Sequence, residues 1–197
     1  MPELFHTIRQ LIIPRLEKNL DPGLLYHNVG HTLDVLRQAE LIALEEGINP
    51  DKELLLLKTA ALYHDSGFLF TYRNHEEKSC EIARSDLQIF FEEPDLKNIC
   101  EMIMATKIPQ SPHNLLEEII CDADLDYLGR DDFEPVSMNL YHEFITFGIL
   151  NGDESWDHIQ IRFFEAHHYF TRTITEKRNG KKLEHLQQLK RRSGWNQ

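Results

Sequence analysis

Cysteine is scarce in this sequence, and long apolar runs are missing from it. The 197 residues include only Cys80, Cys100 and Cys121, and no two of them form a CxxC pair. This spacing favours neither a thiolate metal site nor a disulfide framework. The longest mostly apolar run, residues 54–63, is interrupted by Lys58 and is far shorter than the ~20 residues that span a bilayer. The first ten residues also lack the features of a signal peptide, so we expect a cytoplasmic protein without a membrane span.

Positive charge is scarce as well. Lys and Arg number 21 against 33 Asp and Glu, which gives a formal net charge of −12 and argues against nucleic acid as the main partner. Eight of the 21 basic residues lie in residues 172–192, where only Glu176 and Glu184 oppose them. This basic segment could bind a polyanion, complement the acidic remainder of the chain or form a solvated terminal helix.

Alternating strand patterns and linkers rich in Gly, Ser and Pro are also missing, whereas apolar residues recur at helical spacing in almost every segment. At 41% hydrophobic residues, the chain can bury a core without disulfides. The fold class is therefore predicted to be all-α. We expect helices over residues 3–20 (bent at Pro14), 25–46, 52–65, 74–93, 95–107, 114–129, 132–148 and 154–180, followed by a short basic helix.

Two segments combine histidine and acid with an apolar context. His27 and His31 lie one helical turn apart, a spacing that can chelate a metal but also occurs in ordinary buried histidines. His64 and Asp65 end a strongly apolar helix, where burying a carboxylate is costly unless a cation or hydrogen-bond donors offset it. Asp65 could cap nearby backbone N–H groups, but that interpretation gives the adjacent histidine no role.

A third segment, IICDADLDYLGR, places Asp122, Asp124 and Asp126 at alternate positions. Alternate positions on a helix lie about 200° apart, so the three carboxylates cannot share one solvated face. At least one of them should point inward, where its charge needs a cation or hydrogen-bond donors.

Taken in order, His31, His64-Asp65 and Asp124 resemble the H…HD…D signature of the HD-domain superfamily of metal-dependent phosphohydrolases. The flanking stretches YHNVGHTLDVL, AALYHDSGF, NHEEKSCEIA and DADLDYLG are similar too, and the resemblance covers roughly residues 24–130. It implies one all-helical domain over residues 1–197, a bundle of the HD-domain type. The metal-binding core would occupy about residues 24–130, and a C-terminal helical extension about residues 131–192.

The resemblance implies that His31, His64, Asp65 and Asp124 coordinate one divalent metal ion. Asp124 stands in the ADLDYL context typical of the family's last ligand, and Asp122 is the competitor for that place. Two imidazoles and two carboxylates suit Mn, Fe, Co, Ni, Zn or Mg, among which the sequence does not choose.

One position departs from the family pattern and bears on the number of metal ions. Thr106 stands where many relatives carry a further histidine, and His113 aligns poorly with that place. A single metal ion is therefore expected, which counts against the di-iron oxygenases that share the fold.

The same resemblance points to further site residues. Together with Asp65, His75 and Glu76 could contact phosphate or transfer protons; alternatively, Glu76 complements a helix dipole and His75 is a surface residue. Lys107, Arg73 and His27 are the candidates for binding substrate, although Lys107 and Arg73 could equally be solvated.

The function implied is hydrolysis of a small phosphorylated metabolite, such as a nucleotide, by a metal-activated water. The alternative is a regulatory module that binds a nucleotide or a metal without turnover. A membrane or nucleic-acid partner is not expected, and the oligomeric state is left open.

Overall fold

The prediction of an all-α fold is confirmed by the computed structural model, which describes residues 2–48, 51–150 and 154–195. Helices and no strand occur in these residues. In chain order the elements are α1 (Pro2–Asn19), α2 (Val29–Glu45), α3 (Asp51–Tyr63), the 3₁₀ helix η1 (Ser66–Leu69), α4 (His75–Leu87), α5 (Glu93–Ala105), α6 (Leu115–Asp124), the 3₁₀ helix η2 (Asp126–Gly129), α7 (Phe133–Thr146), α8 (Trp156–Ala166) and α9 (Arg172–Ser193).

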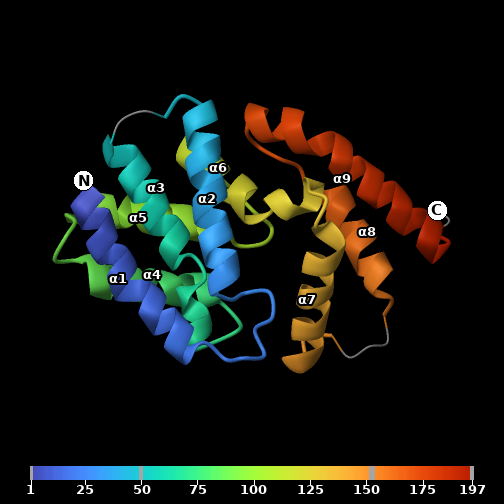
Figure 1. Cartoon of the computed structure of the whole chain (residues 1–197), viewed down its shortest axis with the longest axis horizontal. Helices are drawn as coiled ribbons and strands as arrows, with labels where there is room; N and C mark the ends of the chain where they lie inside the picture. The colour runs from blue at the N-terminus through green and yellow to red at the C-terminus, as the bar shows by residue number, and fades with distance from the viewer. Residues whose placement is uncertain (1, 49–50, 151–153, 196–197) are drawn as a thin grey trace.

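The helices form two neighbouring groups (Figure 1). Helices α1 to α6 make up the first, and α7 to α9 lie beside it, with the long α9 packed against α8 and η2. Within the described ranges, none of the helices combines the length and the hydropathy that crossing a bilayer requires.

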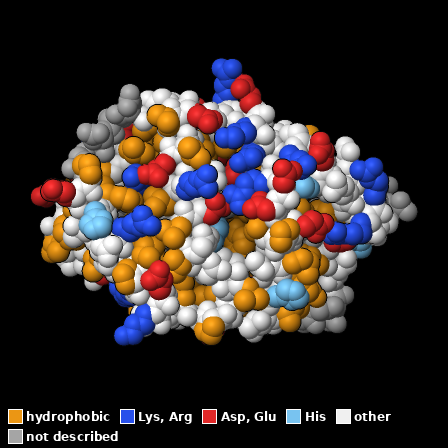
Figure 2. Space-filling model, viewed as in Figure 1, with side chains coloured by type: hydrophobic (Ala, Val, Ile, Leu, Met, Phe, Trp, Pro, Cys, Tyr) orange, Lys and Arg blue, Asp and Glu red, His pale blue; other side chains and the backbone are white. Residues whose placement is uncertain are grey.

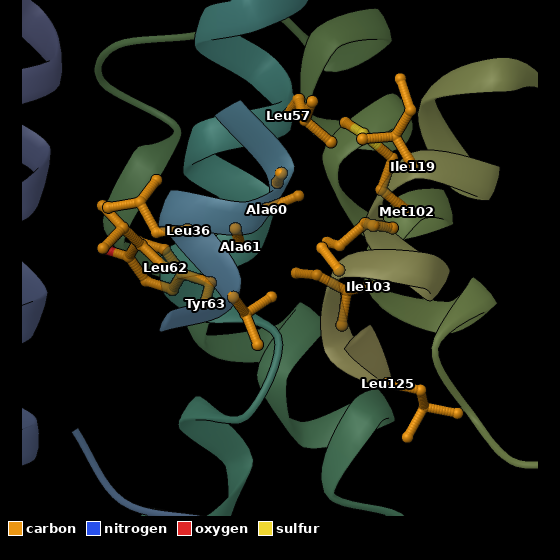
Figure 3. Packing of buried hydrophobic residues seen from close by; sticks show 14 of the residues in the cluster. Leu36, Leu57, Ala60, Ala61, Leu62, Tyr63, Met102, Ile103, Ile119 and Leu125 are labelled. Atoms are coloured by element: carbon orange, nitrogen blue, oxygen red, sulfur yellow. The ribbon is translucent and has the colours of Figure 1, made fainter. Parts of the chain in front are cut away.

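Helix α3 is the centre of the core. Leu57, Ala60 and Ala61 are fully buried, and α3 packs against α1, α2 and α5. Figure 3 shows Leu57 and Ala60 on the side of α3 that faces Met102 of α5. The small alanines allow neighbouring helices to approach closely, while each buried leucine stabilises the fold by about 1.5–3 kcal/mol. This packing fixes the end of α3, where His64 and Asp65 follow.

Helix α2 begins later than the sequence pattern predicts. Its N-cap is Asn28, whose side-chain oxygen accepts from Gly30 N at 2.8 Å and His31 N at 3.3 Å. The segment before the cap is a loop, held where Tyr26 N and His27 N donate to the Glu143 carboxylate at 2.8 and 3.0 Å. His27 therefore lies outside the helix that carries His31, so the two histidines are not an i,i+4 pair on one helix.

The predicted helix over residues 154–180 is wrong, because α8 ends at Ala166 and α9 begins at Arg172. The Asp122 carboxylate accepts from Phe170 N at 2.9 Å, Thr171 N at 2.8 Å and Thr171 Oγ1 at 2.6 Å. These bonds hold the connecting segment in a non-helical conformation, and Thr171 then caps α9. His167 consequently lies in the connection, not in a helix. The predicted helix over 114–129 is likewise divided, at Leu125, into α6 and η2.

The basic residues of α9 complement the acidic remainder of the chain. Arg178 donates to both carboxylate oxygens of Asp126, at 2.7 and 3.0 Å, and Arg192 pairs with Asp157 at 2.7 Å. The Asp126 side chain is 1% exposed, so its pair with Arg178 contributes more than an exposed pair would. In Figure 2 the Lys and Arg side chains on this face are interspersed with Asp and Glu. Of the three interpretations of the basic segment, this arrangement favours intramolecular complementarity.

Candidate metal centre

Four side chains from three separate segments converge where α2 begins and where α3 and α6 end. His31 belongs to the first turn of α2, His64 and Asp65 follow α3, and Asp124 ends α6. Nε2 of His31 lies 3.4 Å from Nε2 of His64, 3.4 Å from Oδ2 of Asp65 and 3.1 Å from Oδ1 of Asp124. Nε2 of His64 lies 3.2 Å from the same Asp65 oxygen and 3.7 Å from the same Asp124 oxygen.

These separations suit the coordination of one cation. Donor atoms at about 2.0–2.2 Å from a divalent ion lie roughly 2.8–3.6 Å apart in tetrahedral or cis octahedral geometry. The donor atoms of His31, His64 and Asp65 form a compact cluster that could hold a metal ion. Asp124 approaches the two imidazoles of that cluster through one oxygen.

The protonation of His64 prepares it as a ligand. Its Nδ1 lies 2.8 Å from the carbonyl oxygen of Ala61, which can only accept, so Nδ1 carries a proton and Nε2 faces the cluster. Oδ2 of Asp65 is buried and has no hydrogen-bond partner among the described residues. Nε2 of His31 and Nε2 of His64 lie 3.4 and 3.2 Å from it. A cation between these atoms would satisfy that oxygen.

The charges of the cluster are strongly coupled. Burial alone would lower the pKa of His64, but Asp65 and Asp124 raise it well above its ordinary value. Burial alone would raise the pKa of Asp124, but hydrogen bonds and charge from His31 and His64 lower it to about 2. The two acids therefore favour a positive charge at this point, either a proton on His64 or a metal ion. Metal binding would displace any such proton, because the ligand imidazole must offer a free Nε2.

His75 lies on the other side of Asp65. Its Nδ1 donates to Tyr72 O at 3.3 Å, and its Nε2 lies 3.4 Å from Oδ1 of Asp65 and 3.6 Å from Oε1 of Glu76. Burial alone would lower the pKa of His75, but Asp65 raises it. The two oxygens of Asp65 thus face different groups: Oδ2 faces the cluster and Oδ1 faces His75. Glu76 is buried, at 7% exposed.

His27 is positioned by a residue that the sequence did not single out. The Glu143 side chain, fully buried, contacts the ring Nδ1 of His27 and accepts from its backbone N–H and from the Tyr72 hydroxyl at 2.8 Å. The His27 ring stacks on Phe68 at 4.3 Å between centroids, and Phe68 stacks on His75 at 4.0 Å. His27 and His75 therefore enclose one phenyl ring beside the cluster.

The other predicted site residues lie apart from the imidazoles. Nζ of Lys107 contacts the Glu77 carboxylate and lies 3.5 Å from Oδ1 of Asn74, and Arg73 is exposed. Asp122 faces Thr171, so Asp124 is the acid that the structure brings to the histidines. Burial raises the pKa of Asp122 to about 6, although its hydrogen bonds from residues 170 and 171 oppose the rise.

A cavity of about 300 Å³ adjoins the cluster. His27, Asp65, His75, Glu76 and Asp124 line one part of it, together with Thr106, whose hydroxyl donates to Ile103 O at 2.8 Å. Side chains of α7 and α8 line much of the rest, with further lining from Tyr26, Ile108, Leu125, Tyr127 and Leu128. The described residues that line this cavity include no Lys or Arg, so histidines and any bound cation would have to meet the charge of a phosphate.

Comparison with known proteins agrees with this geometry. The family model of the HD domain matches residues 28–126, and the chain belongs to this family, whose members are generally metal-dependent hydrolases. A curated relative from Clostridium beijerinckii, described as an uncharacterized protein, is 36% identical over 89 residues, which is 43% of this chain and 55% of that protein. The match thus spans about half of the relative's length. No solved structure matches the chain.

Proposed function

We propose that the protein is a metal-dependent phosphohydrolase that acts on a small phosphorylated metabolite. The observation that carries this proposal is the convergence of His31, His64, Asp65 and Asp124 on one point beside a cavity. Two imidazoles and two carboxylates suit one divalent ion, of Mn, Fe, Co, Ni, Zn or Mg. Thr106 offers a hydroxyl that is already bonded to a backbone carbonyl, which supports a single ion.

A divalent ion in this cluster would polarise a phosphate oxygen and acidify a bound water. The protein's own part is to orient the reacting groups and to move protons. Asp65 faces both histidines, with Oδ2 at 3.2 Å from Nε2 of His64 and Oδ1 at 3.4 Å from Nε2 of His75. Nε2 of His75 also lies 3.6 Å from Oε1 of Glu76, and its proton would pass to the leaving oxygen. Asp65, His75 and Glu76 are therefore the proposed catalytic set.

The substrate contacts are proposed in the same way. His27 lines the cavity and is held by Glu143, so its ring can bind a phosphate oxygen without an additional ordering cost. Lys107 could reach substrate only by leaving Glu77, and Arg73 only from its exposed position. Nucleotides belong to the class of small phosphorylated metabolites to be assayed.

The test is a metal analysis joined to phosphate release. Wild type, purified with Mn²⁺, is compared with His64→Ala and with His185→Ala, which removes a buried histidine outside the cluster whose Nε2 donates to Arg130 O at 2.8 Å. We expect wild type and His185→Ala to hold metal and release phosphate from at least one phosphoester of a panel, and His64→Ala to lose both. Bound metal with no phosphate released from any ester would contradict the hydrolase and favour a binding module.

A further inference from the structure

The part of the cavity formed by α7 and α8 is almost entirely apolar. Its lining there includes Phe133, Leu140, Phe144, Trp156, Phe163 and Phe164. Binding to such a surface is favourable for the carbon atoms of a ligand. It is unfavourable for hydroxyl groups, which leave water and find no hydrogen-bond partner there. The organic part of a bound compound should therefore be mainly apolar.

One chain of hydrogen bonds crosses this apolar wall and ends without an acceptor. Nε1 of Trp156 donates to Oγ of Ser137 at 3.2 Å. Because the indole N–H can only donate, the hydroxyl accepts that bond and donates its own proton to Oε1 of Gln160, at 2.5 Å. The chain fixes the orientation of the Gln160 amide and leaves its NH₂ group as the free end.

The free end is buried. Gln160 is 5% exposed, and its Nε2 has no hydrogen-bond partner among the described residues. An unsatisfied buried donor is destabilising, yet Ser137 and Trp156 hold this one in place at the wall of the cavity. Gln160 lines the cavity, and because its Nε2 is covered in this conformation, a small shift of the side chain is needed before an acceptor in the cavity can meet the amide.

We propose that the cavity selects phosphate esters of an apolar alcohol that carries one hydrogen-bond acceptor, such as a carbonyl oxygen, which accepts from the Gln160 amide. This inference rests on the proposed function, since the phosphate would lie at the metal cluster. The polar groups of α7 and α8 that line the cavity support this proposal. Ser137 and Trp156 are already hydrogen-bonded, so the Gln160 NH₂ is the donor group left free. A nucleoside brings several hydroxyls and ring nitrogens that this wall would leave unpaired.

The test compares esters that differ in one acceptor. Benzyl phosphate and 4-acetylbenzyl phosphate have similar leaving groups, because a methylene separates the ring from the ester oxygen, and only the second carries a carbonyl. We expect wild type to prefer 4-acetylbenzyl phosphate by about fivefold in kcat/KM, the factor that one neutral hydrogen bond is worth. Both esters should exceed AMP and UMP.

The variant Gln160→Leu should abolish the preference for the acetyl compound. Gln38→Leu is the matched control, because it removes another buried glutamine, on α2, that does not line the cavity; it should retain the preference. The readout is a ratio of two kcat/KM values, so a uniform loss of activity does not imitate the expected result. If Gln160→Leu does not fold, as judged by circular dichroism, Gln160→Met replaces it.

Two results would overturn the inference: a wild-type preference for AMP or UMP over both benzyl esters, or an unchanged ratio in the Gln160 variant. A separate binding experiment distinguishes this failure from that of the hydrolase. Binding of 4-acetylbenzyl alcohol, followed by calorimetry, requires neither metal nor turnover. Should no ester release phosphate, weaker binding of this alcohol to Gln160→Leu than to wild type would still support the cavity inference, and equal binding would refute it.

Discussion

Glu143 of α7 holds His27 twice, through the backbone N–H at 3.0 Å and through the ring Nδ1. The two residues are separated by 116 positions, so the C-terminal helices determine the conformation of the loop that precedes the metal centre. Burial would raise the pKa of Glu143, but its contacts with His27 lower it. The carboxylate is therefore ionised and accepts bonds from several donors at once.

Replacing Glu143 by alanine should destabilise the protein strongly. The change leaves the backbone N–H groups of Tyr26 and His27 and the Tyr72 hydroxyl without their acceptor. We expect the free energy of unfolding to fall by about 3 kcal/mol, measured by urea denaturation. Glu134→Ala, on the same helix, removes an exposed partner of Arg192 and should cost at most about 1 kcal/mol. Equal losses in the two variants would contradict the role assigned to Glu143.

The sequence predicted the fold class and the convergence of three elements, but not every local feature. His31 and the His64-Asp65 pair could be recognised because their apolar flanks are local in sequence. Glu143 could not, because it looks like any glutamate on an amphipathic helix, and its burial depends on a loop far away in the chain. Its partners are mostly backbone groups, which leave no mark on the pattern.

The boundary between α8 and α9 could not be predicted from the local sequence either. The residues from His167 to Thr171 carry no Gly or Pro, and their spacing favours a continuous helix. The hydrogen bonds from Phe170 and Thr171 to Asp122 override that preference, and Asp122 lies 48 positions earlier. The alternation of Asp122, Asp124 and Asp126 did indicate inward-pointing acids. It could not indicate that each serves a different partner: a connection, the histidines and Arg178.

The two candidate ligands on α6 can be separated by matched substitutions. Asp124→Asn removes the carboxylate that lies 3.1 Å from His31 and should abolish stable metal binding. Asp122→Asn should retain the metal but lose about 1–3 kcal/mol of stability, because an amide cannot accept all three bonds from Phe170 and Thr171. Metal content by mass spectrometry and thermal unfolding are measured for both variants. Metal lost from Asp122→Asn and retained by Asp124→Asn would reverse the assignment.

Lys182 should make stability depend on pH in the alkaline range. It is buried on α9, donates to His167 O and lies 5.6 Å from the Tyr169 ring centroid. Burial lowers its pKa to about 8, whereas an unfolded lysine titrates near 10.4. Between these values the unfolded state binds more protons, so the free energy of unfolding rises with pH above about 8, and the cost of the buried charge is complete below it.

The comparison with Lys182→Met isolates this contribution. Urea denaturation from pH 7.5 to 9.5 should show a rise in wild type relative to the variant, whose stability lacks this titration. The upper limit keeps the measurement below the range in which unfolded tyrosines ionise. A difference between wild type and Lys182→Met that stays constant over this range would show that Lys182 does not titrate there.

Metal binding should stabilise the fold through the same side chains that hold the ion. His31, His64-Asp65 and Asp124 come from the ends of α2, α3 and α6, so an ion would join three helices that unfolding separates. At a free Mn²⁺ concentration of 100 times Kd, the expected gain is about 2.7 kcal/mol for one site. Thermal unfolding of chelator-treated protein should show a rise in Tm on adding Mn²⁺ for wild type and for His185→Ala, and none for His64→Ala. The titration should end at one ion per chain, because Thr106 donates its hydroxyl to Ile103 O and adds no imidazole. Two ions per chain would contradict the single-ion site. A Tm shift that survives in His64→Ala would place the metal on other residues.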